Sequence, residues 1–202
     1  YKEESSQNLR IKSFNALNTY LLDLQSKGLL CKQSEWIVRK TKFGGGQTTD
    51  VEAFKVYSKN PALEAIGTKL LTDTEQNRDE IKYYYFFTNK VVLPNINPHF
   101  PLVSVSEQCD LCEGVHLKLS KCLLVFSELA DGSAAQYFPS GKLSFDRRDE
   151  VLSMVCQVIM ALISLDQIFL PLRYVSGSGT IEFATDTAKS ASFSQIIISG
   201  SA

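Results

Sequence analysis

The sequence has no strong excess of charge of either sign. Its 202 residues include 21 basic and 22 acidic side chains, so the formal net charge is -1. A chain with this balance has no overall electrostatic attraction for nucleic acid or for an anionic membrane surface. We therefore expect neither nucleic acid nor a membrane among its partners.

Long hydrophobic runs are also missing. The longest apolar stretches, such as VIMALISL at residues 158–165, are shorter than the roughly 18 residues that a membrane-spanning helix requires. No signal-peptide pattern opens the chain, and its first residue is Tyr1 rather than methionine. We expect a soluble, cytoplasmic protein, and the missing methionine is compatible with a fragment of a longer chain.

Cysteine occurs only five times, and an odd number cannot all pair within one chain. The residues are spread along the sequence as Cys31, Cys109, Cys112, Cys122 and Cys156. This pattern is not typical of the disulfide framework of a secreted protein, so we expect a reducing compartment. Cys31 and Cys156 are expected to be small core residues.

Apolar residues make up 44% of the chain, which is enough to form a core. Their spacing at three and four residues predicts helices, and their alternation predicts strands. The predicted elements are a helix over 6–27, strands over 35–43, 51–57 and 65–71, a helix over 72–92, strands over 102–105 and 121–126 around a loop that contains CDLC, and a helix over 146–168. Five strands with an inserted helix predict an α+β fold. The last helix is apolar on most faces, which predicts its burial.

Three glycines join the first two predicted strands, in the segment FGGGQTTDV. Gly44, Gly46, Thr49 and Val51 fit the spacing G-x-G-x-x-G-x-V, with threonine in place of the third glycine. Because Gly44, Gly45 and Gly46 carry no side chains, their backbone N–H groups could approach the phosphates of a nucleotide. The alternative is a hairpin turn that binds no ligand.

From about Trp36 to Ile168, the order of elements and three motifs resemble a protein kinase. The motifs are the glycine-rich hairpin, AIGTK in the third strand, and LVFSELADGS, which is similar to the hinge between the two kinase lobes. NPHFPLV and ELADGS resemble the diverged kinases of large DNA viruses in particular. The resemblance therefore also implies a viral protein, located in the host cell or in the virion.

The resemblance implies three regions. Residues 1–34 would form an N-terminal helical extension. Residues 35–128 would form a domain like the kinase N-lobe, with a five-stranded antiparallel sheet and a packed helix. Residues 129–202 would be an incomplete, mainly helical C-lobe and tail.

The resemblance further implies a binding site for ATP and Mg²⁺. Lys69 would bind the α- and β-phosphates, and Glu80 would be its carboxylate partner, with Glu75 as the second candidate. Without the resemblance, such a lysine and glutamate are ordinary solvated surface residues. The aromatic run at residues 83–87 is expected to pack in the core.

In the hinge-like motif, Ser127 occupies the gatekeeper position. The resemblance implies that backbone groups of Glu128 and Ala130 bind the adenine edge, while Val51 covers the adenine ring. The implied partners are a nucleotide and a protein substrate, which would receive phosphate on Ser or Thr.

The sequence departs from the kinase pattern after the last helix. Phe169, Leu170 and Pro171 stand where the family has its catalytic His-Arg-Asp, and Asp186 is a poor match to the metal-binding aspartate. Either the chain is a non-catalytic pseudokinase, or residues that would follow Ile168 are missing from it. Phosphate transfer is therefore expected only if a catalytic loop exists in the full chain.

Cys109, Cys112, His116 and Cys122 have the spacing C-x2-C-x3-H-x5-C. Zinc binds four nitrogen or sulfur ligands in a tetrahedron, and a C-x2-C turn can supply two of them. This spacing predicts a zinc site, and with it the alternative function of a zinc-stabilised interaction module. The competing interpretation is a loop with reduced thiols and a solvated histidine.

Overall fold

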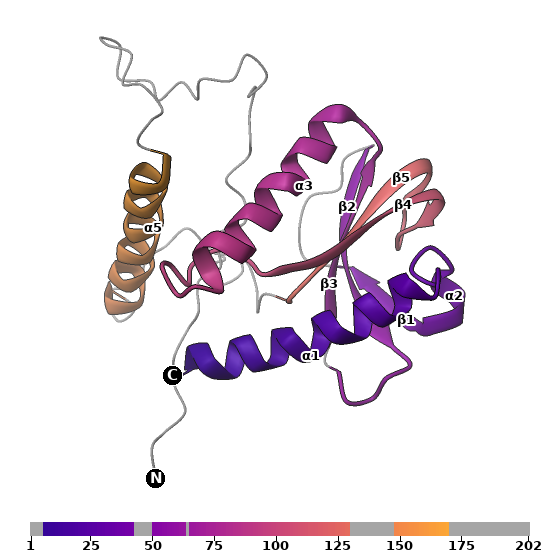
Figure 1. Cartoon of the computed structure of the whole chain (residues 1–202), viewed down its shortest axis with the longest axis horizontal. Helices are drawn as coiled ribbons and strands as arrows, with labels where there is room; N and C mark the ends of the chain where they lie inside the picture. The colour runs from indigo at the N-terminus through magenta and orange to yellow at the C-terminus, as the bar shows by residue number, and fades with distance from the viewer. Residues whose placement is uncertain (1–5, 43–49, 64, 130–147, 170–202) are drawn as a thin grey trace.

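The computed structural model describes residues 6–42, 50–63, 65–129 and 148–169, and it has the expected α+β class (Figure 1). A five-stranded sheet forms its centre, with helices packed beside it. The elements are α1 (Ser6–Ser26), α2 (Gln33–Trp36), β1 (Ile37–Lys42), β2 (Val51–Ser58), β3 (Ile66–Thr72), α3 (Glu75–Phe87), the π-helical turn η1 (Thr88–Val92), β4 (Val103–Glu113), β5 (Lys118–Ser127) and α5 (Arg148–Phe169).

The sheet has the strand order β1-β2-β3-β5-β4, and every neighbouring pair is antiparallel. β3 is the central strand. Its Lys69 lies opposite Ala53 of β2 and opposite Val125 of β5. A side chain at this position therefore starts from the middle of the sheet, where the backbone is held on both sides.

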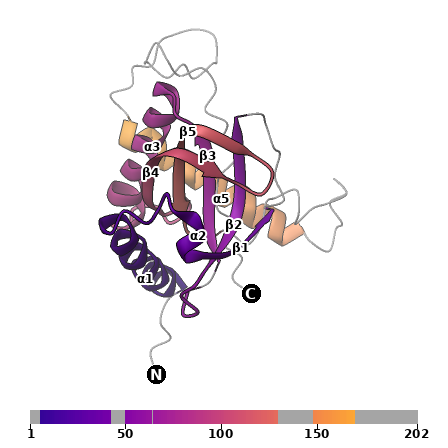
Figure 2. The same ribbon diagram turned by 90° about the vertical axis from the view of Figure 1, so that its right-hand side faces the viewer.

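Two helices lie along the β4 side of the sheet (Figure 2). The apolar stripe of α1 is buried, as its periodicity predicts; it comprises Phe14, Leu17, Leu21 and Leu24. α3 follows β3 after a short connection and contacts β4. The helix inserted between the third and fourth strands is therefore packed on the sheet.

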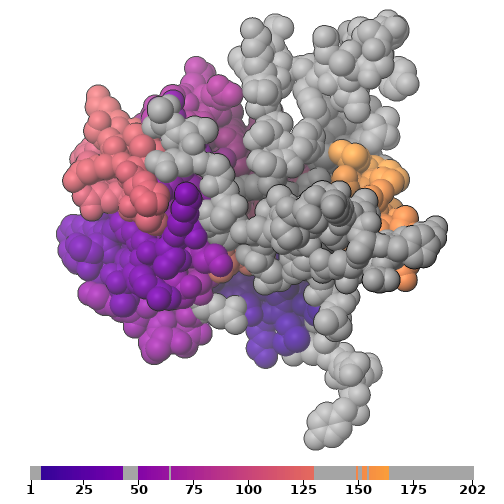
Figure 3. All heavy atoms as spheres, turned by 180° about the vertical axis from the view of Figure 1, so that it is seen from behind, coloured from indigo at the N-terminus to yellow at the C-terminus, as the bar shows by residue number. Residues whose placement is uncertain are grey.

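The CDLC segment is part of β4, so the prediction of a loop at these residues was wrong. β4 and β5 continue as a long hairpin whose turn includes Gly114. The hairpin closes onto the start of the sheet, because Lys40 of β1 donates a hydrogen bond to the carbonyl oxygen of Glu113. In the space-filling view, its salmon surface lies against the violet surface of the first strands (Figure 3).

The buried carboxylate of Glu52 in β2 holds the turn of this hairpin. It is only 3% exposed, and it accepts hydrogen bonds from the backbone N–H groups of Val115, His116 and Leu117 at 2.9 to 3.2 Å. Three backbone donors compensate for much of the cost of burying a charged group. This contact, rather than local propensity, explains why the strands extend beyond the predicted limits.

Helix α5 is present where the sequence predicts it, and it runs without a break through Ile168 to Phe169. The expectation that most of its faces are buried was wrong. Ala161 is buried in a cluster with Phe14 and Leu102, and Asn97 donates a hydrogen bond to the carbonyl oxygen of Met160 at 3.1 Å. Among the side chains that the structure describes on this helix, six large apolar ones are exposed, namely Leu152, Val155, Ile159, Met160, Leu162 and Ile163.

The structure contains two disulfide bonds, Cys31–Cys109 and Cys112–Cys122. The expectation that the cysteines do not form disulfides was therefore wrong for these four residues, because the fold brings together cysteines 78 positions apart. Cys156 is exposed on α5 rather than part of a core. None of the helices that the structure describes has an apolar stretch long enough to cross a membrane.

Candidate functional site

Lys69 of β3 and Glu80 of α3 form an ion pair, with 2.6 Å between Nζ of Lys69 and Oε1 of Glu80. The side chain of Lys69 is 20% exposed and that of Glu80 is 35% exposed. The structure thus brings together the two charged residues that the sequence singled out. Glu75, the second candidate, lies in the exposed first turn of α3.

The start of α3 explains why Glu80 reaches the central strand. The side chain of Thr74 caps the helix by accepting a hydrogen bond from the backbone N–H of Asn77 at 3.2 Å. The amide of Asn77 donates to the carbonyl oxygen of Thr72, the last residue of β3, at 2.8 Å. The first turn of the helix is therefore tied to the end of the strand, and this fixes the position of Glu80 relative to Lys69.

Tyr84 completes this pair, and sequence reasoning assigned it only a packing role. Its hydroxyl donates a short hydrogen bond to Oε1 of Glu80 and accepts one from Nζ of Lys69 at 3.2 Å. Burial, together with the charge of Glu80, raises the pKa of Tyr84 well above its usual range, so the hydroxyl keeps its proton. The sequence does contain a signal for this contact. Tyr84 lies four positions after Glu80, and residues four positions apart share a helix face.

The ammonium group of Lys69 can still bind an anion. A lysine has three N–H donors, and here Glu80 and Tyr84 accept two of them. The third donor and the partial exposure of the side chain suit a phosphate oxygen approaching from solvent. Charge-assisted hydrogen bonds of this kind are stronger than neutral ones.

The segment after β5 is fixed by contacts with α1 and with the segment before β4. The carboxylate of Glu128 accepts hydrogen bonds from Nε of Arg10 at 2.8 Å and from the backbone N–H of Leu102 at 2.7 Å. The backbone N–H of Glu128 donates to the carbonyl oxygen of Leu102 at 3.0 Å. Sequence reasoning assigned a role only to the backbone of Glu128 and missed its side chain, because Arg10 is 118 positions away.

Gly67 allows this segment to approach β3 closely. A Cβ atom at position 67 would lie 2.7 Å from the carbonyl oxygen of Glu128 and 2.8 Å from Oγ of Ser127. Ser127 also donates a hydrogen bond to that carbonyl oxygen at 3.0 Å. The glycine thus matches a contact that leaves no space for a methyl group.

The remaining predicted nucleotide contacts are only partly described. Val51 is half-buried at the start of β2, opposite Leu71, and packs on the cluster that includes Ile81 and Val125. This cluster also contacts Tyr84, so Val51 lies on the same side of the sheet as α3. The other predicted contacts, Gly44, Gly45, Gly46, Thr49 and Ala130, lie outside the described residues.

The structure does not assemble the predicted zinc ligands. Cys109 is bonded to Cys31 and Cys112 to Cys122, while the side chain of His116 is exposed in the hairpin turn. In this disulfide-bonded form, no group of three or more His, Cys, Asp or Glu side chains among the described residues is arranged to hold a metal ion. The thiolates that zinc needs are taken up by sulfur–sulfur bonds.

No model of a known protein family matches the chain, and no curated protein matches it either. A fold alone would not define an activity, because function depends on the groups that a particular site presents. The groups that this site presents are the ion pair of Lys69 and Glu80, the half-buried Tyr84 and the constrained segment at Ser127 and Glu128.

Proposed function

We propose that this protein is a protein kinase-like protein that binds ATP between the glycine-rich hairpin and the segment after β5. The observation that carries the proposal is the ion pair between Lys69, on the central strand, and Glu80, on the helix inserted before β4. The strand order β1-β2-β3-β5-β4 puts Lys69 on the strand next to β5, whose end leads into the segment at Glu128. The resemblance to protein kinases implies this combination.

A purely structural role explains the pair less well. An isolated ion pair on a protein surface contributes only about 0 to 1 kcal/mol. Taking charges out of water costs free energy, so a partly buried lysine in the middle of a sheet is a poor choice for stability alone. Lys69 has a third N–H donor that can bind a ligand, whereas an apolar residue at position 69 would have none.

Each residue has a defined part in this proposal. Lys69 binds oxygens of the α- and β-phosphates, while Glu80 and Tyr84 hold its ammonium group in position. The backbone N–H of Glu128 already donates to Leu102, so its carbonyl oxygen, with a second lone pair beside the bond from Ser127, would accept from the adenine edge. Ser127 provides a small gatekeeper side chain. Mg²⁺ would neutralise the phosphate charge, and no set of protein ligands for it occurs among the described residues.

Binding and phosphate transfer are separate parts of the proposal. Transfer to Ser or Thr of a protein needs an aspartate base. The kinase pattern puts Phe169, Leu170 and Pro171 at that position, and α5 continues through Phe169. ATP binding is therefore the function proposed for these residues, with transfer only in a longer chain that supplies the base. This observation favours a non-catalytic pseudokinase as the second candidate.

A thermal unfolding experiment with ATP and MgCl₂ tests the binding site. A ligand at 100 times its dissociation constant stabilises the folded state by about 2.7 kcal/mol, so Tm should rise for the wild-type chain. Lys69→Met should remove the rise. Lys82→Met is the matched control, because Lys82 lies on α3 with a 77% exposed side chain and pairs with Asp79.

The outcomes separate the candidates. A rise in Tm that Lys69→Met removes and Lys82→Met retains supports ATP binding. A wild-type chain whose Tm does not respond to ATP and MgCl₂ contradicts it. Release or transfer of labelled γ-phosphate to a generic protein substrate then distinguishes an enzyme from a pseudokinase.

A further inference from the structure

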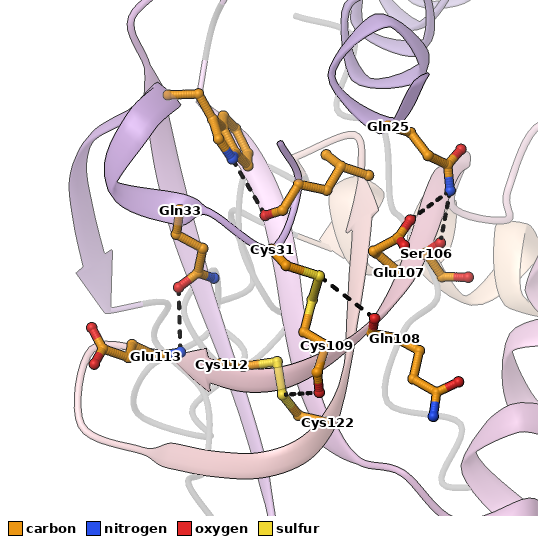
Figure 4. The surroundings of a disulfide bond; sticks show 12 residues. Gln25, Cys31, Gln33, Ser106, Glu107, Gln108, Cys109, Cys112, Glu113 and Cys122 are labelled. Atoms are coloured by element: carbon orange, nitrogen blue, oxygen red, sulfur yellow. Dashed lines mark hydrogen bonds between the residues drawn. A yellow bond between two sulfur atoms is a disulfide. The ribbon is translucent and has the colours of Figure 1, made fainter. Parts of the chain in front are cut away.

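Four of the five cysteines gather at one place, although they come from three separate segments. Cys31 belongs to the connection between α1 and α2, Cys109 and Cys112 belong to β4, and Cys122 belongs to β5. Figure 4 shows the two disulfides lying next to each other, between the connection after α1 and the β4–β5 hairpin. The fold therefore brings together cysteines that are widely spaced in the sequence.

Contacts link the two disulfides directly. Cys109 and Cys122 are opposite each other in the β4–β5 ladder, and Sγ of Cys122 lies 3.2 Å from the carbonyl oxygen of Cys109. The Cα atoms are 5.5 Å apart in the Cys31–Cys109 pair and 6.1 Å apart in the Cys112–Cys122 pair. All four residues thus form one continuous cluster.

The cluster is enclosed by the protein. Cys109 is 3% exposed, and Cys112 and Cys122 are 0% exposed. They belong to the apolar core cluster that includes Leu30 and Trp36, and Cys31 packs against it. Reduction of the two disulfides would leave three thiols with little access to water, next to the partly exposed thiol of Cys31.

We propose that the reduced chain binds one zinc ion through the thiolates of Cys31, Cys109, Cys112 and Cys122. A Zn–S distance of about 2.3 Å in a tetrahedron puts neighbouring sulfurs about 3.8 Å apart. The Cα distances of 5.5 and 6.1 Å within the two pairs, and the facing positions of Cys109 and Cys122 in the β4–β5 ladder, allow sulfurs to take up that separation once the S–S bonds are broken. The burial of the cluster gives it the closed character of a structural site.

This ligand set differs from the one that the sequence spacing suggests. Cys31 replaces His116, because the fold brings Cys31 to Cys109 across 78 positions. His116 is exposed, and its backbone N–H donates to Glu52. A zinc ion in this cluster would join the connection after α1 to the β4–β5 hairpin, as the disulfide does in the oxidised form.

The two forms are related by a balanced redox step. A low-molecular-weight thiol supplies the electrons: four thiol molecules reduce the two protein disulfides and become two disulfide molecules. Four electrons and four protons thereby pass to the cysteine sulfurs. Zinc binding then releases the protons of the thiols that it coordinates. The zinc-bound and disulfide forms exclude each other, because the same sulfurs form both.

The test uses the full chain, reduced with a phosphine and titrated with ZnCl₂ in the absence of other metals. Mass spectrometry of the bound metal should give one zinc ion per chain. Cys31→Ser should weaken zinc binding at least about tenfold, since even loss of an outer-shell partner costs 10- to 100-fold. His116→Ala and Cys156→Ser should bind zinc like the wild type.

A second measurement does not depend on the folding of a variant. Co²⁺ in the wild-type reduced chain should give the absorption of a tetrahedral four-sulfur site. Zinc should also protect four cysteines, all except Cys156, from alkylation. The proposal is overturned if the reduced chain binds no zinc, or if His116→Ala weakens binding while Cys31→Ser does not. Disulfides that persist under the reductant overturn it as well.

Discussion

Arg10 of α1 binds both carboxylate oxygens of Glu128, the residue directly after β5, at N–O distances of 2.8 and 2.5 Å. Both side chains are only 16% exposed. The same guanidinium donates hydrogen bonds to the carbonyl oxygens of Pro98 and Phe100, in the segment before β4. One arginine therefore joins the N-terminal helix, this segment and the proposed adenine-binding backbone.

Arg10→Met should destabilise the protein by about 2 to 3 kcal/mol, because it leaves the carboxylate of Glu128 partly buried without its cation. The double variant with Glu128→Gln should recover part of this loss, since the uncompensated charge is then removed. Urea unfolding of the four chains of this double-mutant cycle measures the coupling. Lys12→Met, at an exposed position on α1, serves as the control. If the effects of the two changes on the free energy of unfolding are additive, the side chains of Arg10 and Glu128 do not interact.

Gly67→Ala should also destabilise the chain, by roughly 1 to 3 kcal/mol, because overpacking forces the backbone to move. The added Cβ would lie 2.7 Å from the carbonyl oxygen of Glu128. Removing the hydroxyl of Ser127 in a double variant should relieve only part of the strain, since the carbonyl oxygen remains. Chemical denaturation measures the free energy of unfolding. If Gly67→Ala is as stable as the wild type, β3 and the segment at Ser127 and Glu128 do not pack as closely as these distances imply.

The sequence predicts the elements well where a local pattern specifies them. The apolar steps of α1 and the alternation of β2 mark their burial directly, and the buried residues follow these patterns. Lys69 and Glu80 could be singled out because β3 and α3 adjoin in the chain. Tyr84 carried a signal too, since it follows Glu80 by one helical turn, but its aromatic neighbours suggested packing alone.

Contacts between distant segments could not be predicted in this way. Nothing in the local pattern at Arg10 indicates a partner 118 positions away, and Cys31 gives no sign of Cys109. The predicted limits of β4 were wrong for the same reason. CDLC has little strand character by itself, and the closure of the hairpin onto Glu52 holds it in the strand. Tertiary contacts override weak local preference at such positions.

Glu52→Gln tests the closure of the β4–β5 hairpin. The amide keeps one acceptor oxygen but directs an NH₂ group at the three backbone donors of residues 115–117, so we expect a loss of about 2 to 3 kcal/mol. Gly114→Ala should act on the same contact, because its Cβ would lie 1.9 Å from Oε2 of Glu52. Asp110→Asn, at an exposed position of β4, should change little. Equal stabilities of all three variants would contradict this role of Glu52.

His99 should make the stability of the chain depend on pH. Burial, and then the positive charge of Arg10, lowers the pKa of His99 below its usual value of 6.5, and its Nδ1 atom is buried without a hydrogen-bond partner. A base with a lowered folded-state pKa favours the folded state above its unfolded pKa. That contribution is lost as the pH falls through the folded value.

The measurement is urea unfolding from about pH 7.5 to about pH 5, a range that spans the usual pKa of histidine. The wild type should lose more stability on acidification than His99→Gln, because glutamine binds no proton. His116→Gln, which removes an exposed histidine in the hairpin turn, should retain the wild-type dependence. If His99→Gln loses as much stability as the wild type, protonation of His99 is not coupled to folding, and the carboxylates account for the acid sensitivity.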